Sequence, residues 1–198
     1  MQAQQMAAFF LFAVAAAVTP GPSNLLVMAA GARGGWQGGL RCLAGVVVGM
    51  ALLIGVAAFG LAGVLQAWPG LLMALRAGGS LFLLWLAWQI AKAPPMRAGG
   101  EPPPAGFGAA FALQWVNPKS WIVGASAAAT FSAAPGQPAA THAALLAVLF
   151  ALAAAPSCAV WLVGGAMLQR WMKDARRARW VNGGMGLLLA ASVVMLWT

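Results

Sequence analysis

Long apolar runs with almost no charge constrain the fold of this chain more than any other feature of its sequence. A helix that crosses a bilayer needs about 20 mostly apolar residues. Six stretches approach or exceed that length: 6–32, 40–65, 70–91, 107–131, 143–168 and 180–197. Short polar or Pro/Gly-rich segments separate them. The sequence therefore predicts an all-α membrane protein with six transmembrane helices.

The composition excludes most soluble classes of protein. Hydrophobic residues make up 63% of the 198 residues and charged residues 7%, whereas soluble domains have about 45–50% and about 25%. A soluble chain of this size could not bury that much apolar surface. The net charge of +9 comes from small basic groups between apolar runs. We therefore expect anionic lipid as the partner, and no nucleic acid.

The basic residues also predict an orientation, because cytoplasmic loops carry an excess of Lys and Arg. Nine of them fall in or beside the first, third and fifth loops: Arg33, Arg41, Lys92, Arg97, Arg170, Lys173, Arg176, Arg177 and Arg179. The loops 66–69 and 133–141 contain none. With six crossings, both termini should lie outside the cytoplasm. Because no Lys or Arg precedes the first run, we expect a retained helix and not a cleaved signal peptide.

A Pro/Gly-rich linker at 93–106 divides the chain into halves of three predicted helices each, 1–92 and 107–198. An odd number of crossings in each half makes the halves enter the membrane from opposite sides. We therefore expect a single transmembrane domain, 1–198, that consists of two inverted repeats.

Helices 1 and 4, the first helix of each half, are both interrupted. The first break reads Thr19-Pro20-Gly21-Pro22-Ser23-Asn24 and the second reads Asn117-Pro118-Lys119-Ser120. Proline removes a backbone donor and disrupts the preceding turn, and the freed carbonyls need partners inside a membrane. Interrupted helices at corresponding positions of two repeats point to a transporter's binding site. The alternative is a pair of kinks that only shape the bundle.

A small zwitterion would suit the space between these breaks. The half-helices that follow them offer N–H groups to a carboxylate, and the unwound carbonyls near Val18, Thr19 and Val116 can accept from an ammonium. The predicted substrate-binding residues are Thr19, Pro20, Gly21, Pro22, Ser23, Asn24, Asn117, Pro118, Lys119 and Ser120. The prolines and the glycine shape the site, and the polar side chains bind.

Lys119 is the one charge placed well inside a predicted membrane run, and no carboxylate lies in any of the six runs. Such a residue is a functional candidate by default, which here would attract a substrate carboxylate in an aqueous cavity. Alternatively, its side chain extends to the cytoplasmic interface. The sequence leaves both interpretations open.

These segments resemble the LysE-type amino-acid exporter family, which includes RhtB-type exporters. The matching pieces are the first break, the turn 31–35, the glycines within 45–49, the segment 75–88, and the stretch from Gly108 to the second break. The resemblance covers nearly the whole chain. It implies a secondary transporter that exports amino acids or related small metabolites across the bacterial inner membrane, driven by the proton gradient.

The chain departs from that family in its fifth helix. Many members carry an acidic residue there, where this chain reads Ala155-Pro156-Ser157-Cys158-Ala159, and its only acids are Glu101 and Asp174. Proton coupling through a buried carboxylate therefore does not carry over. Either Lys119, a loop acid or His142 takes that part, or the protein is a facilitator, or it has lost transport and serves as a membrane partner or sensor.

Other chemistry is weakly represented in the sequence. His142 is the only histidine, which excludes a histidine metal cluster and favours an interface residue. We expect no enzyme activity, no metal and no cofactor. A thiol–disulfide electron carrier would use Cys42 and Cys158, but no Cys-x-x-Cys motif is present and buried cysteines usually act as small apolar residues.

The oligomeric state stays open at this stage. Glycines on the predicted second and sixth helices, among them Gly183, Gly184 and Gly186, can pack within one chain or between two copies in a homodimer.

Overall fold

The computed structural model describes residues 1–61, 69–93, 105–133, 136–169, 174–194 and 197, and these residues form helices without a strand. In chain order they are α1 (Ala3–Val18), α2 (Pro22–Val56), the π-helical turn η1 (Ala57–Leu61), α4 (Pro69–Ala91), α5 (Phe107–Val116), α6 (Pro118–Thr130), α7 (Ala139–Gln169) and α8 (Ala175–Ala191). The predicted all-α class is confirmed. Residues 94–104 of the predicted linker, with Arg97 and Glu101, lie outside the described residues, as do Arg170 and Lys173.

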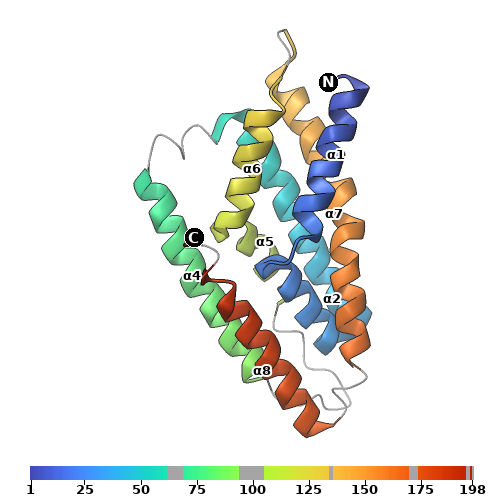
Figure 1. Ribbon diagram of the computed structural model, residues 1–198, viewed down its shortest axis with the longest axis vertical. Coiled ribbons are helices and arrows are strands. Elements are labelled where there is room, and N and C mark those ends of the chain that lie inside the picture. Colours follow the sequence, from blue (N-terminus) through green and yellow to red (C-terminus); the bar gives the residue numbers. More distant parts are fainter. Residues whose placement is uncertain (62–68, 94–104, 134–135, 170–173, 195–196, 198) are drawn as a thin grey trace.

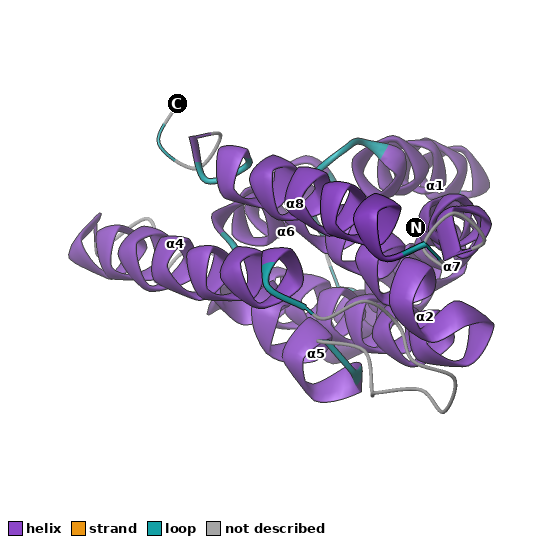
Figure 2. Ribbon diagram, turned by 90° about the horizontal axis from the view of Figure 1, so that it is seen from below, coloured by secondary structure: helices purple, strands orange, loops and turns teal. Residues whose placement is uncertain are grey.

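The helices form two packed groups. α2 packs along α7, and α4 packs along α8, while α1 lies against α7 and α5 against α2. Figure 1 shows α4 and α8 running together along one edge of the molecule. In the perpendicular view of Figure 2, α1, α2 and α7 stand together on the opposite side from α4.

The described helices suit a membrane. Three are long and apolar enough to cross one, Pro22–Gly60, Met73–Ala91 and Ala139–Gln169, and α1 and α5 are shorter apolar helices. Large apolar side chains are exposed on their outer faces, for example Leu81 at 71% and Leu152 at 60%. Exposed apolar surface on this scale is a membrane or partner surface and is rare on soluble monomers.

The segment predicted to separate the first two runs is a tight turn within α2, which consists of two helical segments joined at a kink. The chain turns there at Gly35, whose φ of 58° and ψ of −152° interrupt an otherwise helical stretch. This left-handed φ is readily adopted only by glycine. Arg33, which we expected in the first loop, is buried in the helical segment just before this turn.

The last helix is shifted relative to the predicted run 180–197. α8 begins at Ala175 because Asp174 caps it, its carboxylate accepting from the amides of Arg176 at 3.0 Å and Arg177 at 2.9 Å. The basic residues predicted for the fifth loop, Arg176 to Arg179, thus lie in the first turns of a helix.

His142 is buried near the start of α7 and is 3% exposed. Its Nε2 lies 2.6 Å from the carbonyl oxygen of Phe131, at the end of α6. It therefore joins two helix ends inside the protein, where the sequence had suggested an interface.

Two of the three buried apolar clusters of the described residues make up most of the core. One contains Leu26, Leu113 and Leu162, and the other contains Phe9, Ile54 and Phe150. A polar pocket lies where they meet, because its walls take Val46 and Cys158 from the first cluster and Met50 and Phe150 from the second.

Candidate substrate site

Both helix breaks contribute to this one pocket. Its lining comes from α1, α2, α5, α6 and α7: Ala16, Ala17, Gly21, Pro22, Ser23, Asn24, Val46, Met50, Gln114, Asn117, Lys119, Ser120, Val123, Phe150, Ala154 and Cys158. The cavity volume is about 40 Å³. One buried water molecule needs about 10–15 Å³ of cavity volume measured in this way, so the pocket has room for a few water molecules.

Side chains take up the carbonyls that the first break frees. α1 ends at Val18, and α2 starts at Pro22. Asn24, which is 4% exposed, donates from Nδ2 to the carbonyl oxygens of Ala17 at 2.7 Å and Thr19 at 2.9 Å. Trp161 of α7 donates from Nε1 to the carbonyl of Val18 at 3.2 Å. The unwound turn is thereby satisfied by protein groups, as a membrane interior requires.

The second break is capped locally. Asn117 precedes Pro118, the first residue of α6, and its Oδ1 accepts from the Lys119 amide at 3.1 Å. The Ser120 amide donates to the Asn117 carbonyl at 3.0 Å. We expected open amides at this position. The Lys119 amide is paired because an asparagine stands at the N-cap, and the Ser120 amide is paired with the backbone of the same residue.

The Val116 carbonyl does not face the pocket. It lies against α4, where a Cβ added at Gly79 would be 2.0 Å from the Val116 oxygen. The expectation that this carbonyl accepts from a substrate ammonium was wrong, because close packing of α4 on α5 covers it.

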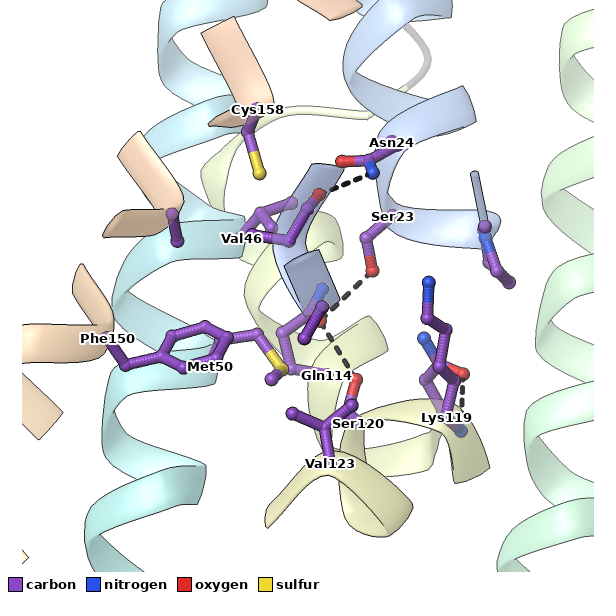
Figure 3. Close-up of a pocket in the computed structure, with 16 residues that line it drawn as sticks. Ser23, Asn24, Val46, Met50, Gln114, Lys119, Ser120, Val123, Phe150 and Cys158 are labelled. Carbon is purple, nitrogen blue, oxygen red and sulfur yellow. Dashed lines mark hydrogen bonds between the residues drawn. The ribbon is translucent and has the colours of Figure 1, made fainter. Parts of the chain in front are cut away.

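Gln114 connects the segments that follow the two breaks. It is fully buried in α5, and its Oε1 accepts from Ser23 Oγ at 3.0 Å and from Ser120 Oγ at 3.1 Å. Its Nε2 donates to the Ala110 carbonyl at 2.9 Å, which fixes the amide orientation. In Figure 3, dashed lines trace the chain Ser23–Gln114–Ser120 through the centre of the pocket.

Lys119 reaches across from α6 to the first break. Its Nζ donates to the carbonyl oxygens of Thr19 at 3.1 Å and Pro20 at 3.3 Å. Its stem lies over Gly21, where an added Cβ would be 3.1 Å from Nζ and 3.3 Å from Cδ. Lys119 lines the pocket and is half-buried there. Among the described residues, the one carboxylate side chain is that of Asp174, which caps α8.

An apolar wall completes the pocket. In Figure 3, Met50 and Phe150 lie on the opposite side of Gln114 from Lys119. Cys158 also lines the pocket, and Cys42 is buried in the neighbouring cluster; both are free thiols. Cys158 lies far in sequence from either break, so sequence reasoning placed it apart from them.

The structure brings most of the predicted site residues together. Those that line the pocket are Gly21, Pro22, Ser23, Asn24, Asn117, Lys119 and Ser120. Thr19 and Pro20 contribute carbonyls to Lys119, and Pro118 begins α6 beside the pocket without lining it.

Sequence reasoning missed Gln114 and Trp161. Gln114 carried a usable signal, because an amide side chain one turn before the second break is unusual inside an apolar run. Trp161 gave no such signal in the sequence, because its hydrogen bond depends on how α7 is rotated relative to the first break.

The arrangement offers a cation, a row of backbone acceptors and hydroxyl groups inside a membrane bundle. A pocket between two broken helices of an all-helical membrane protein is typical of the class of secondary transporters. The family model described as LysE type translocator matches residues 14–197. The chain therefore belongs to the LysE type translocator family.

Several efflux proteins are similar to the chain over nearly its whole length. It is 33% identical to "Cysteine/O-acetylserine efflux protein" of Salmonella choleraesuis (strain SC-B67) and to the protein of that name from Salmonella typhimurium (strain LT2), over 97% of both chains. The protein of the same name from Escherichia coli (strain K12) is 32% identical over 97% of both chains. No solved structure matches the chain.

Proposed function

We propose that this chain exports amino acids or related small zwitterionic metabolites across a bacterial inner membrane. The observation that carries the proposal is the meeting of the two breaks: Lys119, after the second, donates to the carbonyls of Thr19 and Pro20 in the first. An ionisable residue within a membrane-spanning segment is a functional candidate by default, and this one bonds to the carbonyls of a broken helix. The relatives named for cysteine and O-acetylserine efflux support the same substrate class.

Each part of a zwitterion has a suitable counterpart in the pocket. A carboxylate suits the ammonium of Lys119, and an ammonium suits the carbonyls of the first break, to which Lys119 now donates. A short side chain suits the wall near Met50. The binding residues of the proposal are the predicted set from both breaks together with Gln114.

The proposal includes two inverted repeats, 1–92 and 107–198, joined by the linker 93–106. Counterpart helices pack together under this assignment, because α2 lies along α7 and α4 along α8. Export would then follow from rocking of one repeat against the other around the pocket.

The proposed orientation places both termini in the periplasm. In Figure 1, the end of α7 and the start of α8, with its arginines, share one end of the molecule, and the N-terminus lies at the other. A reporter enzyme that is active only in the periplasm, fused after Thr198, should be active; an inactive fusion in an expressed protein contradicts the orientation.

A homodimer belongs to the same proposal. Gly186 of α8 packs on α4, where an added Cβ would be 2.7 Å from the Ala87 carbonyl, whereas Gly183 and Gly184 have open space. Those two glycines leave a flat helix face for a second copy. The variants Gly183→Cys and Gly184→Cys should each cross-link two copies in membranes. A chain that stays monomeric in membranes contradicts the homodimer.

Efflux from proteoliposomes tests the main proposal. Vesicles that contain the purified chain are loaded with labelled cysteine or O-acetylserine under reducing conditions, with and without a pH gradient. We expect faster efflux than from protein-free vesicles, and a dependence on the gradient would indicate proton coupling. A folded protein that moves neither compound, nor any other amino acid, would instead favour a partner or sensor that has lost transport.

A further inference from the structure

The ammonium of Lys119 already occupies the position that a substrate ammonium needs. We propose that Lys119 is a built-in occupant of this subsite, displaced only by a substrate that carries both an ammonium and a carboxylate. This inference rests on the proposed function and adds a basis for its selectivity. In Figure 3, Lys119 lies beside the Ser23–Gln114–Ser120 chain, with its stem directed toward the first break.

Both lone pairs of the Thr19 carbonyl are in use. One accepts from Asn24 Nδ2 at 2.9 Å and the other from Lys119 Nζ at 3.1 Å, and a carbonyl oxygen has two such positions. Asn24 is buried and also bonds the Ala17 carbonyl. Lys119 is half-buried at the end of a flexible stem, so it is the donor that leaves when another ammonium arrives.

Lys119 needs a new partner when it leaves. An unpaired ammonium within a membrane bundle is costly, and no carboxylate lies in the described helices. The carboxylate of the substrate supplies that partner. The exchange therefore moves Lys119 from the carbonyls to the substrate carboxylate, while the substrate ammonium takes the carbonyls of Thr19 and Pro20.

The size of the pocket agrees with such an exchange. With Lys119 across the first break, the cavity volume is about 40 Å³, which is space for a few water molecules. The stem fits there because Gly21 has no side chain. Movement of Lys119 thus enlarges the pocket and frees the carbonyls of Thr19 and Pro20 in one step.

The consequence is selectivity for zwitterions. An amine without a carboxylate cannot draw Lys119 away, so it meets an occupied subsite. An N-acylated amino acid lacks the ammonium that replaces Lys119 on the carbonyls. A site that merely attracted anions would also accept the N-acylated amino acid. A site with free carbonyls would also accept the amine without a carboxylate.

Transport by the full chain in proteoliposomes tests this inference. Labelled cysteine, its decarboxylated amine cysteamine, and N-acetylcysteine are compared for the wild type, Lys119→Met and Lys119→Arg. Met matches the length of the stem without its charge, and Arg keeps the charge. We expect the wild type to move cysteine about tenfold faster than either analogue, or more.

Lys119→Met should raise the KM for cysteine about tenfold or more, because a hydrogen bond to a charged group is lost. It should also raise the cysteamine-to-cysteine ratio about tenfold, whereas Lys119→Arg should keep the wild-type ratio. A folded Lys119→Met protein with an unchanged ratio overturns the inference. The wild type alone also tests the inference: transport of cysteamine as fast as cysteine overturns it. A wild type that moves no amino acid contradicts the proposed function itself.

Discussion

Ser23 Oγ donates to Gln114 Oε1 at 3.0 Å, although the two residues are 91 positions apart in the sequence. The same oxygen accepts from Ser120 Oγ at 3.1 Å. One buried amide therefore fixes the relative position of the two half-helices that follow the breaks. If the halves rock during transport, this is a contact that has to change.

Replacement of Gln114 by leucine should reduce efflux about tenfold or more. The two serine hydroxyls would lose their acceptor, and an unsatisfied buried polar group costs about 1–3 kcal/mol. Efflux from proteoliposomes and thermal unfolding in detergent measure the two effects. Gln89→Leu is the matched control, because Gln89 is exposed on α4. Equal efflux from both variants would exclude Gln114 from the site.

Substitution of Gly21 by alanine should disturb the contact between the two breaks. The new Cβ would lie 3.1 Å from Lys119 Nζ, while the extended φ of 177° tolerates alanine. We expect about tenfold slower efflux, which corresponds to about 1.4 kcal/mol, with little change in thermal stability. Gly108→Ala serves as the control because nothing lies near its added Cβ. Wild-type efflux from Gly21→Ala would count against a role for this contact.

The double variant Pro20→Ala, Pro118→Ala should cut efflux sharply while membrane insertion stays intact. Alanine restores a backbone donor and favours a continuous helix at each break, which would withdraw the carbonyls from Lys119. Efflux is measured together with the amount of protein in the membrane fraction. Pro138→Ala, in the turn before α7, should behave like the wild type. Unchanged efflux in the double variant contradicts the assignment of the site to the breaks.

Both breaks could be predicted from the sequence because proline acts locally. The helices do end at Val18 and Val116, and restart at Pro22 and Pro118. The contacts of Gln114 could not be predicted, because they depend on the rotation of α5 about its axis. The form of the turn between the first two runs could not be predicted either, because a single left-handed glycine, Gly35, joins the two helical segments of α2 without a loop.

Gly45→Ala should destabilise the protein through the packing of α2 on α5. The added Cβ would lie 2.3 Å from the Phe107 carbonyl oxygen, and backbone cannot move aside as a side chain can. We expect a loss of about 1–3 kcal/mol, as for other overpacked cores, read from thermal unfolding in detergent. Efflux should fall as well, because α5 carries Gln114.

Gly55→Ala in the same helix is the matched control. Its added Cβ would lie 3.5 Å from the Ala147 Cβ, an ordinary contact, and alanine favours a helix by about 1 kcal/mol over glycine. This variant should be as stable as the wild type or slightly more stable. Equal unfolding temperatures for the two variants would mean that α2 and α5 separate easily. The position of Gln114 between Ser23 and Ser120 would then not be set by that interface.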